Sequence, residues 1–168
     1  EAPLLKAIAL DDTLAEAHAR LVHIEMGRFW VGDGARSHIA AAFALAEKAL
    51  SADGNDSYCH GAMSVAAAYS NRFDLAMFHI EEALRFNPNN LLAAKNRGMW
   101  LIFLGRSADA LPGLLELFRR DPYPPANYWE VLIAAYFQLG DHERALAAFS
   151  KVSDPQSWEL AYVAASLL

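Results

Sequence analysis

The chain has 168 residues, of which 55% are hydrophobic and 20% charged, so it is long and apolar enough to fold around a core and is not a disordered tail. Its formal net charge of −6 argues against nucleic acid as a partner, because nucleic-acid-binding domains carry a basic face. Its single cysteine, Cys59, excludes an internal disulfide and a cysteine-rich zinc site, and no apolar run approaches the roughly 20 residues of a membrane span. We therefore expect a cytoplasmic protein in a reducing compartment, without a membrane partner.

The first apolar segment, residues 1–12, predicts one helix, the second of a pair whose first helix is missing. It has neither an initiator methionine nor a basic leader, so we expect the chain to be part of a larger protein. Residues 27–38, GRFWVGDGARSH, interrupt the next helical pattern and predict a long turn in which Phe29 and Trp30 cover the end of a helix pair. The alternative is that these aromatic residues contact a partner. A phosphate loop is excluded, since no strand precedes the segment and no Gly-Lys-Ser/Thr follows it.

A unit of about 34 residues recurs along the chain. The segments EKALSADG, EEALRFNP and LELFRRDP end 34 residues apart, at Gly54, Pro88 and Pro122. Alanines recur at intervals of 34, 34 and 35 residues, at Ala42, Ala76, Ala110 and Ala145. The middle of each later unit holds a residue that tolerates the left-handed conformation in which helices often end, namely Asn71, Gly105 and Gly140. Each unit is therefore predicted to be two helices joined by a turn, and the small alanine lets these helices approach closely.

The predicted boundaries divide one repeat domain, residues 1–168, into units of about 13–56, 57–90, 91–124 and 125–156. The prolines of RRDPYPP mark the break between the third and fourth units, because proline cannot continue a helix interior. This segment also supplies the one residue that lengthens the repeat interval from 34 to 35. The last segment, 157–168, predicts a helix that is apolar around much of its circumference, through Trp158, Leu160, Tyr162, Val163, Leu167 and Leu168. We expect this C-terminal helix to pack back as a cap or to join two chains in a homodimer.

This pattern resembles the tetratricopeptide repeat family, whose 34-residue units favour Trp, Leu, Gly, Tyr, Ala, Phe, Ala and Pro at fixed positions. The matching residues of the first two units are Leu21, Ala42, Ala49, Ala76, Ala83 and Pro88. Those of the last two are Gly98, Ala110, Pro122, Trp129, Leu132, Tyr136, Ala145 and Phe149. The resemblance covers nearly the whole chain, although the first unit needs eight extra residues between its helices. It implies an all-α fold, a right-handed α-solenoid of about four units with extra half-units at both ends.

A narrower resemblance concerns residues 121–146, DPYPPANYWEVLIAAYFQLGDHERAL, which look like the repeat region that follows the catalytic domain in some bacterial class III adenylate/guanylate cyclases. It implies that a parent protein carries the cyclase domain, outside this chain. No catalytic residue is transferred by it.

The family resemblance also implies a binding groove, because the first helix of each unit lines the concave face of such arrays. The implied groove residues are Tyr58, Val65, Tyr69, Leu92, Lys95, Met99, Ile102, Phe103, Asn127, Glu130, Phe137 and Gln138, with Arg20 and His23 as additions from the first unit. Their mixture of aromatic, apolar and polar groups suits an amphipathic helix or an extended peptide. The alternative for any one of them is contact with a neighbouring helix. Arg97, at an otherwise apolar position, is expected to snorkel past the helix edge or to offer a fixed cation.

Catalysis finds no support in the sequence. No HExxH, GxSxG, P-loop or dinucleotide motif occurs, and His18 and His23 are five residues apart, which does not align two ligands on one helical face. Surface or groove positions are expected for the histidines, and a buried or half-buried thiol for Cys59. We predict no catalytic, cofactor-binding or metal-binding residues. Our first hypothesis is a non-catalytic module that binds a protein segment, or another domain of its parent; the alternative is a self-associating spacer that pairs attached catalytic domains.

Overall fold

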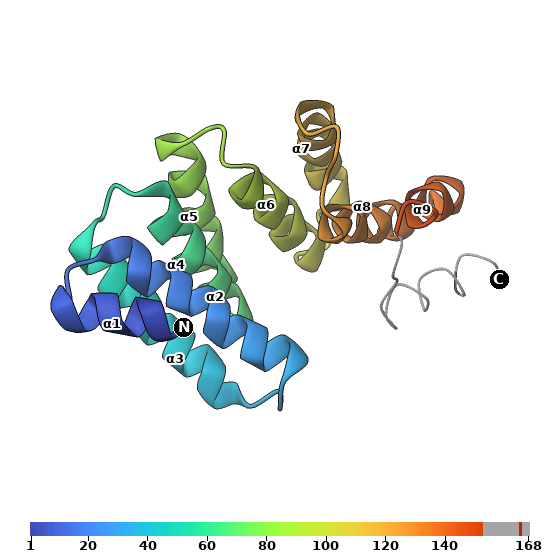
Figure 1. Cartoon of the computed structure of the whole chain (residues 1–168). Helices are drawn as coiled ribbons and strands as arrows, with labels where there is room; N and C mark the ends of the chain where they lie inside the picture. The colour runs from blue at the N-terminus through green and yellow to red at the C-terminus, as the bar shows by residue number, and fades with distance from the viewer. Residues whose placement is uncertain (153–164, 166–168) are drawn as a thin grey trace. The chain divides into compact units, whose positions relative to one another are not determined.

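The computed structural model describes residues 1–152 and 165, and the regular structure of these residues is α-helical throughout. The helices are α1 (Ala2–Leu10), α2 (Ala15–Val31), α3 (Arg36–Ala52), α4 (Ser57–Tyr69), α5 (Phe73–Phe86), α6 (Leu91–Phe103), α7 (Ser107–Arg120), α8 (Ala126–Gln138) and α9 (His142–Phe149) (Figure 1). The chain divides into two compact units, Glu1–Ala93 and Ala94–Leu168, and the division lies inside α6. No helix of the described residues is long and apolar enough to cross a membrane.

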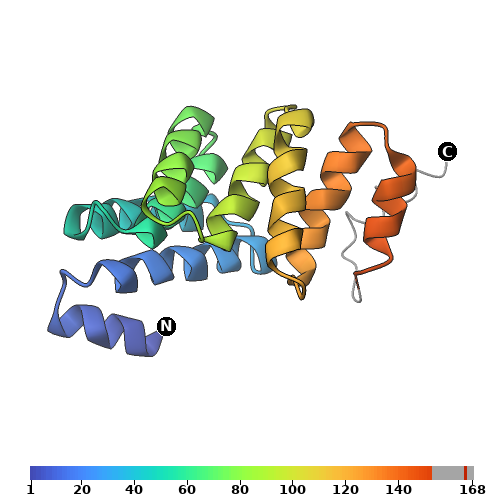
Figure 2. The ribbon, with the colours of Figure 1, turned by 90° about the horizontal axis from the view of Figure 1, so that it is seen from above.

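In the first compact unit, α2 pairs with α3 and α4 pairs with α5, while α4 also packs beside α2 and α3 (Figure 2). Polar side chains cap two of the helix starts: Asp56 accepts a hydrogen bond from the Cys59 amide of α4 at 2.8 Å, and Asn90 accepts one from the Ala93 amide of α6 at 3.0 Å. Helix α1 packs against α2 alone among the described helices and has no buried residue.

The turns inside the later repeats are made as the sequence indicates. Asn71, Gly105 and Gly140 have φ values of 59°, 72° and 74°, in the left-handed region. Each ends the first helix of a pair, so that the chain can reverse and start the second. The prediction for these three positions is confirmed.

The recurring alanines lie in alike surroundings. Each belongs to the second helix of a pair and is at most 2% exposed: Ala42, Ala76, Ala110 and Ala145. In the α4–α5 pair, the Ser64 hydroxyl donates a 2.8 Å hydrogen bond to the Ala76 carbonyl. A side chain larger than alanine would occupy the space that this close approach needs.

The insert differs from its prediction. We expected a long turn over residues 27–38, but α2 continues to Val31 and α3 begins at Arg36, so only residues 32–35 form the connection. Both helices are 17 residues long, against 13 and 14 for α4 and α5. The extra residues therefore lengthen both helices of the pair by about one turn.

In the second compact unit, α8 packs against α7 and α9. Gly98 of α6 lies so close to α7 that a Cβ atom there would approach Leu114 Cδ2 to 2.5 Å. Trp100, on α6, is fully buried. The predicted C-terminal helix, 157–168, with its proposed role as a cap or a dimer contact, lies outside the described residues except for Ala165, which is helical and exposed.

The histidines depart from the expected surface or groove positions. His18 and His60 are only 4% and 6% exposed, His23, His38 and His79 are half-buried, and His142 is exposed. Cys59 is buried, as expected. The histidine prediction is wrong for the two residues at the start of α2 and α4, because both rings form hydrogen bonds inside the fold: His18 with the Asp12 carbonyl, and His60 with the Gly54 carbonyl and with His79.

Candidate partner-binding surface

The side-by-side packing of α2 and α4 forms a surface with an aromatic cluster at each end. At the first end, the Tyr58 ring lies 5.4 Å from the His23 ring, and the Arg20 guanidinium lies 5.7 Å from the centre of the Tyr58 ring. Tyr58 is half-buried, and this burial raises the pKa of its hydroxyl, while the nearby Arg20 cation opposes the rise. Arg20 is exposed and pairs with Glu16 at 2.6 Å. This end therefore offers a flat ring beside a charged pair.

The second cluster lies where the lengthened end of α2 meets the end of α4. The Tyr69 ring lies 5.4 Å from the Trp30 ring and 6.0 Å from the Phe29 ring, both in edge-on arrangement. Burial raises the pKa of Tyr69, against the effect of its hydrogen bond with Trp30. Trp30 remains 50% exposed. The two aromatic residues of the insert thus pack on α4, as expected of residues that cover the end of a helix pair, and Trp30 still presents half of its side chain to solvent.

The two clusters are 11 positions apart on α4, which corresponds to about 16 Å along a helix. An extended peptide advances about 3.3 Å per residue, so about five residues would reach from one cluster to the other. Val65, between them on α4, is only 3% exposed and offers a partner little surface. Most of the contact area on this face is therefore at its ends. We call this surface, defined by Arg20, His23, Tyr58, Trp30 and Tyr69, the α2–α4 face.

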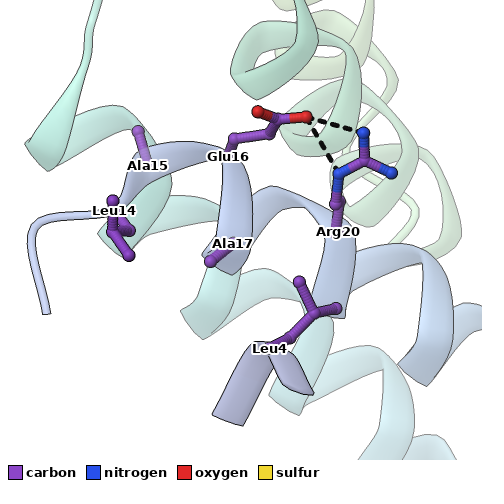
Figure 3. A pocket seen from close by; sticks show the side chains of 6 residues that line it. All are labelled: Leu4, Leu14, Ala15, Glu16, Ala17 and Arg20. Atoms are coloured by element: carbon purple, nitrogen blue, oxygen red, sulfur yellow. Dashed lines mark hydrogen bonds and ion pairs between the residues drawn. The ribbon is translucent and has the colours of Figure 1, made fainter. Parts of the chain in front are cut away.

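A shallow pocket of about 230 Å³ adjoins this face, between α1 and the start of α2. Figure 3 shows its lining, in which apolar side chains stand opposite the Glu16–Arg20 ion pair. The lining residues are Leu4, Leu14, Ala15, Glu16, Ala17 and Arg20. Arg20 thus contributes both to this pocket and to the Tyr58 cluster.

On α6 and α8 the predicted groove residues are unequally accessible. Phe103 is 54% exposed, and Leu92 is 36% exposed. Met99 and Phe137 are half-buried, and Asn127 is exposed. Gln138 is exposed too, although its Oε1 accepts a 2.6 Å hydrogen bond from the Ser107 hydroxyl of α7.

Lys95 and Ile102 differ from this accessible set, because they are only 7% and 2% exposed. Burial lowers the pKa of Lys95 to about 8, and the half-buried carboxylate of Glu130 on α8 opposes that shift. A lysine in this position carries a charge at neutral pH at the expense of stability. It is poorly placed to meet a partner directly. Arg97, the other cation predicted on α6, is half-buried.

Neither a metal-binding cluster nor a reactive cysteine occurs among the described residues. Among residues 1–152 and 165, no group of three or more histidine, cysteine or acidic side chains could hold a metal ion. Burial raises the pKa of the Cys59 thiol to about 12, which leaves it almost entirely protonated and unreactive at neutral pH. Sequence reasoning missed one polar contact, a histidine pair between α4 and α5, because its members are 19 residues apart.

Solved structures resemble this chain over most of its length. A thermophilic tetratricopeptide repeat protein from Thermus thermophilus matches with a TM-score of 0.77 and 17% identity, over 98% of this chain and 88% of its own. The pilF protein of Pseudomonas aeruginosa matches with a TM-score of 0.72 and 23% identity, over 90% of this chain and 68% of its own. YrrB, described as a tetratricopeptide repeat protein with an unusual peptide-binding site, matches with a TM-score of 0.64 and 18% identity, over 97% of this chain and 81% of its own. At these identities the likeness shows the fold, and the predicted all-α solenoid of helix pairs is confirmed.

No protein of curated function matches the sequence significantly. The sequence model of the tetratricopeptide repeat family, by contrast, matches residues 24–164, which are most of the chain. Together with the helix pairs, the buried alanines and the left-handed turn residues, this match shows that the chain belongs to the tetratricopeptide repeat family.

Proposed function

We propose that this chain is a protein-interaction module that binds a peptide segment through the first helices of its repeats, with the α2–α4 face as a principal contact. The tetratricopeptide repeat fold supports a protein–protein interaction module, and proteins of this family are generally non-catalytic. The observation that carries the proposal is the half-exposed Trp30 packed on Tyr69. Aromatic residues with one side packed and the other free are typical of the anchors of protein interfaces.

The distance between the two aromatic clusters suggests what is bound. A segment of about five extended residues could place one side chain on Tyr58 and another on Trp30 and Tyr69. An amphipathic helix of about three turns would cover the same distance. The Glu16–Arg20 pair at one end supplies polar groups that could fix the direction of the peptide. Phe103, Asn127, Phe137 and Gln138 are proposed as further contacts on α6 and α8.

The proposal is tested with peptides selected from a random library against the whole chain, whose affinities are then measured by isothermal titration. Dissociation constants of about 1 µM, equivalent to about −8 kcal/mol, are expected for short peptides. Trp30→Ala and Tyr69→Ala should each weaken binding at least about tenfold, because an aromatic anchor contributes on the order of 2 kcal/mol. Phe103→Ala should weaken the binding of peptides that are long enough to reach α6.

Phe78→Ala is the matched control, since Phe78 is 57% exposed and lies on α5, a second helix. Its loss should leave peptide affinity unchanged. Equal losses for Phe78→Ala and Trp30→Ala, or unchanged affinity for both Trp30→Ala and Tyr69→Ala, would contradict the assignment of the surface. Circular dichroism of each variant separates lost binding from lost folding.

Self-association is the second candidate, favoured by α1. This helix has no buried residue, and it exposes Leu5 and Leu10 at 50% and 82%. A second copy of the chain could cover these leucines, and the chain would then act as a spacer that pairs attached domains. Light scattering across a dilution series measures the mass, which should fall with dilution for the wild-type chain and stay monomeric for Leu10→Glu.

Attachment to a bacterial nucleotide cyclase is proposed only on the resemblance of residues 121–146, and a cytoplasmic location only on the single cysteine. The open reading frame around the chain tests the first proposal, because an upstream cyclase domain is expected. Fractionation of cells that express the full reading frame tests the second.

A further inference from the structure

A histidine pair joins the two helices of one repeat in the first compact unit. His60 of α4 and His79 of α5 place their Nδ1 atoms 2.9 Å apart, and their rings are 5.0 Å apart between centres. His60 Nε2 lies 3.0 Å from the Gly54 carbonyl oxygen, in the turn before α4. His60 is 6% exposed, so this contact is a buried polar connection between three segments.

The geometry fixes where the protons are. A carbonyl oxygen can only accept, so Nε2 of His60 carries a proton and donates a hydrogen bond to the Gly54 carbonyl oxygen. In the neutral ring, Nδ1 of His60 is then an acceptor, and Nδ1 of His79 must donate to it. A proton on His60 Nδ1 would place two N–H groups face to face at 2.9 Å and break the contact. A proton on His79 Nε2 would leave the hydrogen bond in place but would put a positive charge on a half-buried ring, which disfavours the closed form.

The equivalent position in the first repeat shows that the contact is not a general feature of the fold. His18 starts α2 as His60 starts α4, and its Nε2 lies 2.8 Å from the Asp12 carbonyl, also six residues earlier. His18 is 4% exposed, and its Nδ1 has no hydrogen-bond partner. The alanine register of 34 residues aligns Leu45 with His79, so this repeat has a leucine where the donor would stand.

The pair holds the part of α4 that carries Tyr58. Tyr58 lies two residues before His60, in the first turn of α4. Its neighbour Ser57 donates a 2.8 Å hydrogen bond to the Ala83 carbonyl of α5 and accepts one of 2.9 Å from Asn90. The start of α4 is therefore fixed to α5 by polar contacts on one side, and Tyr58 contacts α2 on the other.

We propose that His79 is a positioning residue for Tyr58: through its hydrogen bond to His60 it holds the first turn of α4 in place, and protons taken up by the pair release that turn. The inference rests on the proposed function only where it concerns partner binding, because the release itself needs no ligand.

The surroundings of His79 favour its neutral form at pH 7. Burial of the His79 ring, followed by the neighbouring His60, lowers the pKa of His79 to about 4, and Glu82 opposes this shift. Glu82 is itself paired with Arg85 at 2.6 Å. Below about pH 6.5 an opened, solvated His79 binds a proton more readily than the closed one, so the ratio of closed to open molecules falls by up to about tenfold per pH unit. Further charged groups near this end of α4 are Arg20, beside Tyr58, and Asp53, Asp56 and Glu16, which act on the adjacent Cys59.

Two substitutions separate the hydrogen bond that His79 donates from the proton that His79 takes up. His79→Asn puts an amide nitrogen one bond from Cγ, as histidine puts Nδ1, so it can donate to His60 but takes up no proton. His79→Leu reproduces the arrangement at His18 and Leu45, without a donor. Hydrogen exchange of the Cys59 and His60 amides measures the opening of the first turn, since both amides bond to Asp56. The amides of α8, in the other compact unit, report any global loss of stability.

In the wild-type chain, the protection factors of the Cys59 and His60 amides should fall at least about tenfold between pH 7 and about pH 5. This fall is measured after correction for the intrinsic change in exchange rate, and it should exceed any fall in the protection of the α8 amides. His79→Asn removes one of the two imidazole rings, so its protection should fall clearly less than that of the wild-type chain over this range, whereas His79→Leu should lack the protection at both pH values. Equal pH dependence in the wild-type chain and His79→Asn, or full protection in His79→Leu, would overturn the proposal. At about pH 5 the affinity for a peptide selected against the chain should be highest for His79→Asn, lower for the wild-type chain and lowest for His79→Leu. Failure to find such a peptide would contradict the proposed function alone, because the exchange experiment stands without it.

Discussion

Gly98 offers a direct test of how closely α6 and α7 pack. An added Cβ would lie 2.5 Å from Leu114 Cδ2 and 2.9 Å from Leu114 Cγ, well inside van der Waals contact. Leu114 is 1% exposed, so its side chain can give way only by disturbing the residues packed around it. Overpacking of this kind costs about 1 to 3 kcal/mol. Gly98→Ala also gains about 0.5 to 1 kcal/mol, because alanine is a better helix former than glycine.

Gly113→Ala separates these two effects. Gly113 lies in α7, in the same compact unit, and an added Cβ would meet nothing within 4 Å. This variant should gain the helix-forming contribution alone and become more stable by about 0.5 to 1 kcal/mol. The difference in unfolding free energy between Gly98→Ala and Gly113→Ala then isolates the steric cost, for which we expect about 1 to 3 kcal/mol.

Urea and thermal unfolding, followed by circular dichroism and by tryptophan fluorescence, measure this difference. For a chain of this size 1 kcal/mol corresponds to about 2 to 4 °C in Tm, so the two variants should differ by several degrees, with Gly113→Ala the more stable. Equal stability of the two alanine variants, or a more stable Gly98→Ala, would refute the close packing of α6 on α7 and with it the small-residue explanation of the helix pairs.

Two further predictions concern buried groups. Lys95→Met should stabilise the chain by about 1 to 3 kcal/mol at pH 7, because methionine fills a similar volume without the cost of a buried charge, although Glu130 loses its cation. Since the unfolded lysine keeps its proton up to about pH 10.5 and the folded one only to about pH 8, wild-type stability should rise between these values in chemical denaturation, and a flat profile would contradict the burial of Lys95. The Cys59 thiol, with a pKa of about 12, should react with a disulfide reagent at pH 8 at least about a thousandfold more slowly in the folded chain than in urea, whereas rapid reaction of the folded chain would contradict its burial.

The repeat could be predicted because its signals are local and periodic. Asn71, Gly105 and Gly140 tolerate a positive φ, and each stands at the same place in its unit, so the turns followed from residue type and spacing. The insert was mispredicted for the opposite reason. The 34-residue register places a turn from residue 27 onward, but Phe29, Trp30 and Val31 contain no helix breaker, and the helix ends only at Gly32.

The candidate surface could be predicted only in outline. The family pattern identified Tyr58 and Tyr69 on the first helices, but it gave Val65 and Lys95 the same standing, and these two are buried. Burial depends on how neighbouring helices pack, and a single helix pattern does not contain that information. The contact between His60 and His79 depends in the same way on the rotation of α4 against α5, although the recurrence of histidine at positions 18 and 60 was a signal in the sequence.

The additional turn on α2 and α3 makes this helical hairpin longer than the α4–α5 pair and therefore not interchangeable with it. Units of equal length can be duplicated or exchanged, because every copy fits the same neighbour. A transposed copy of this hairpin would bring its two aromatic rings against Phe103 or Gln138, the counterparts of Tyr69 in the next two units. Phe103 offers an aromatic ring as Tyr69 does, whereas Gln138 is polar and already accepts a hydrogen bond from Ser107, so the hairpin suits the first of these positions better than the second.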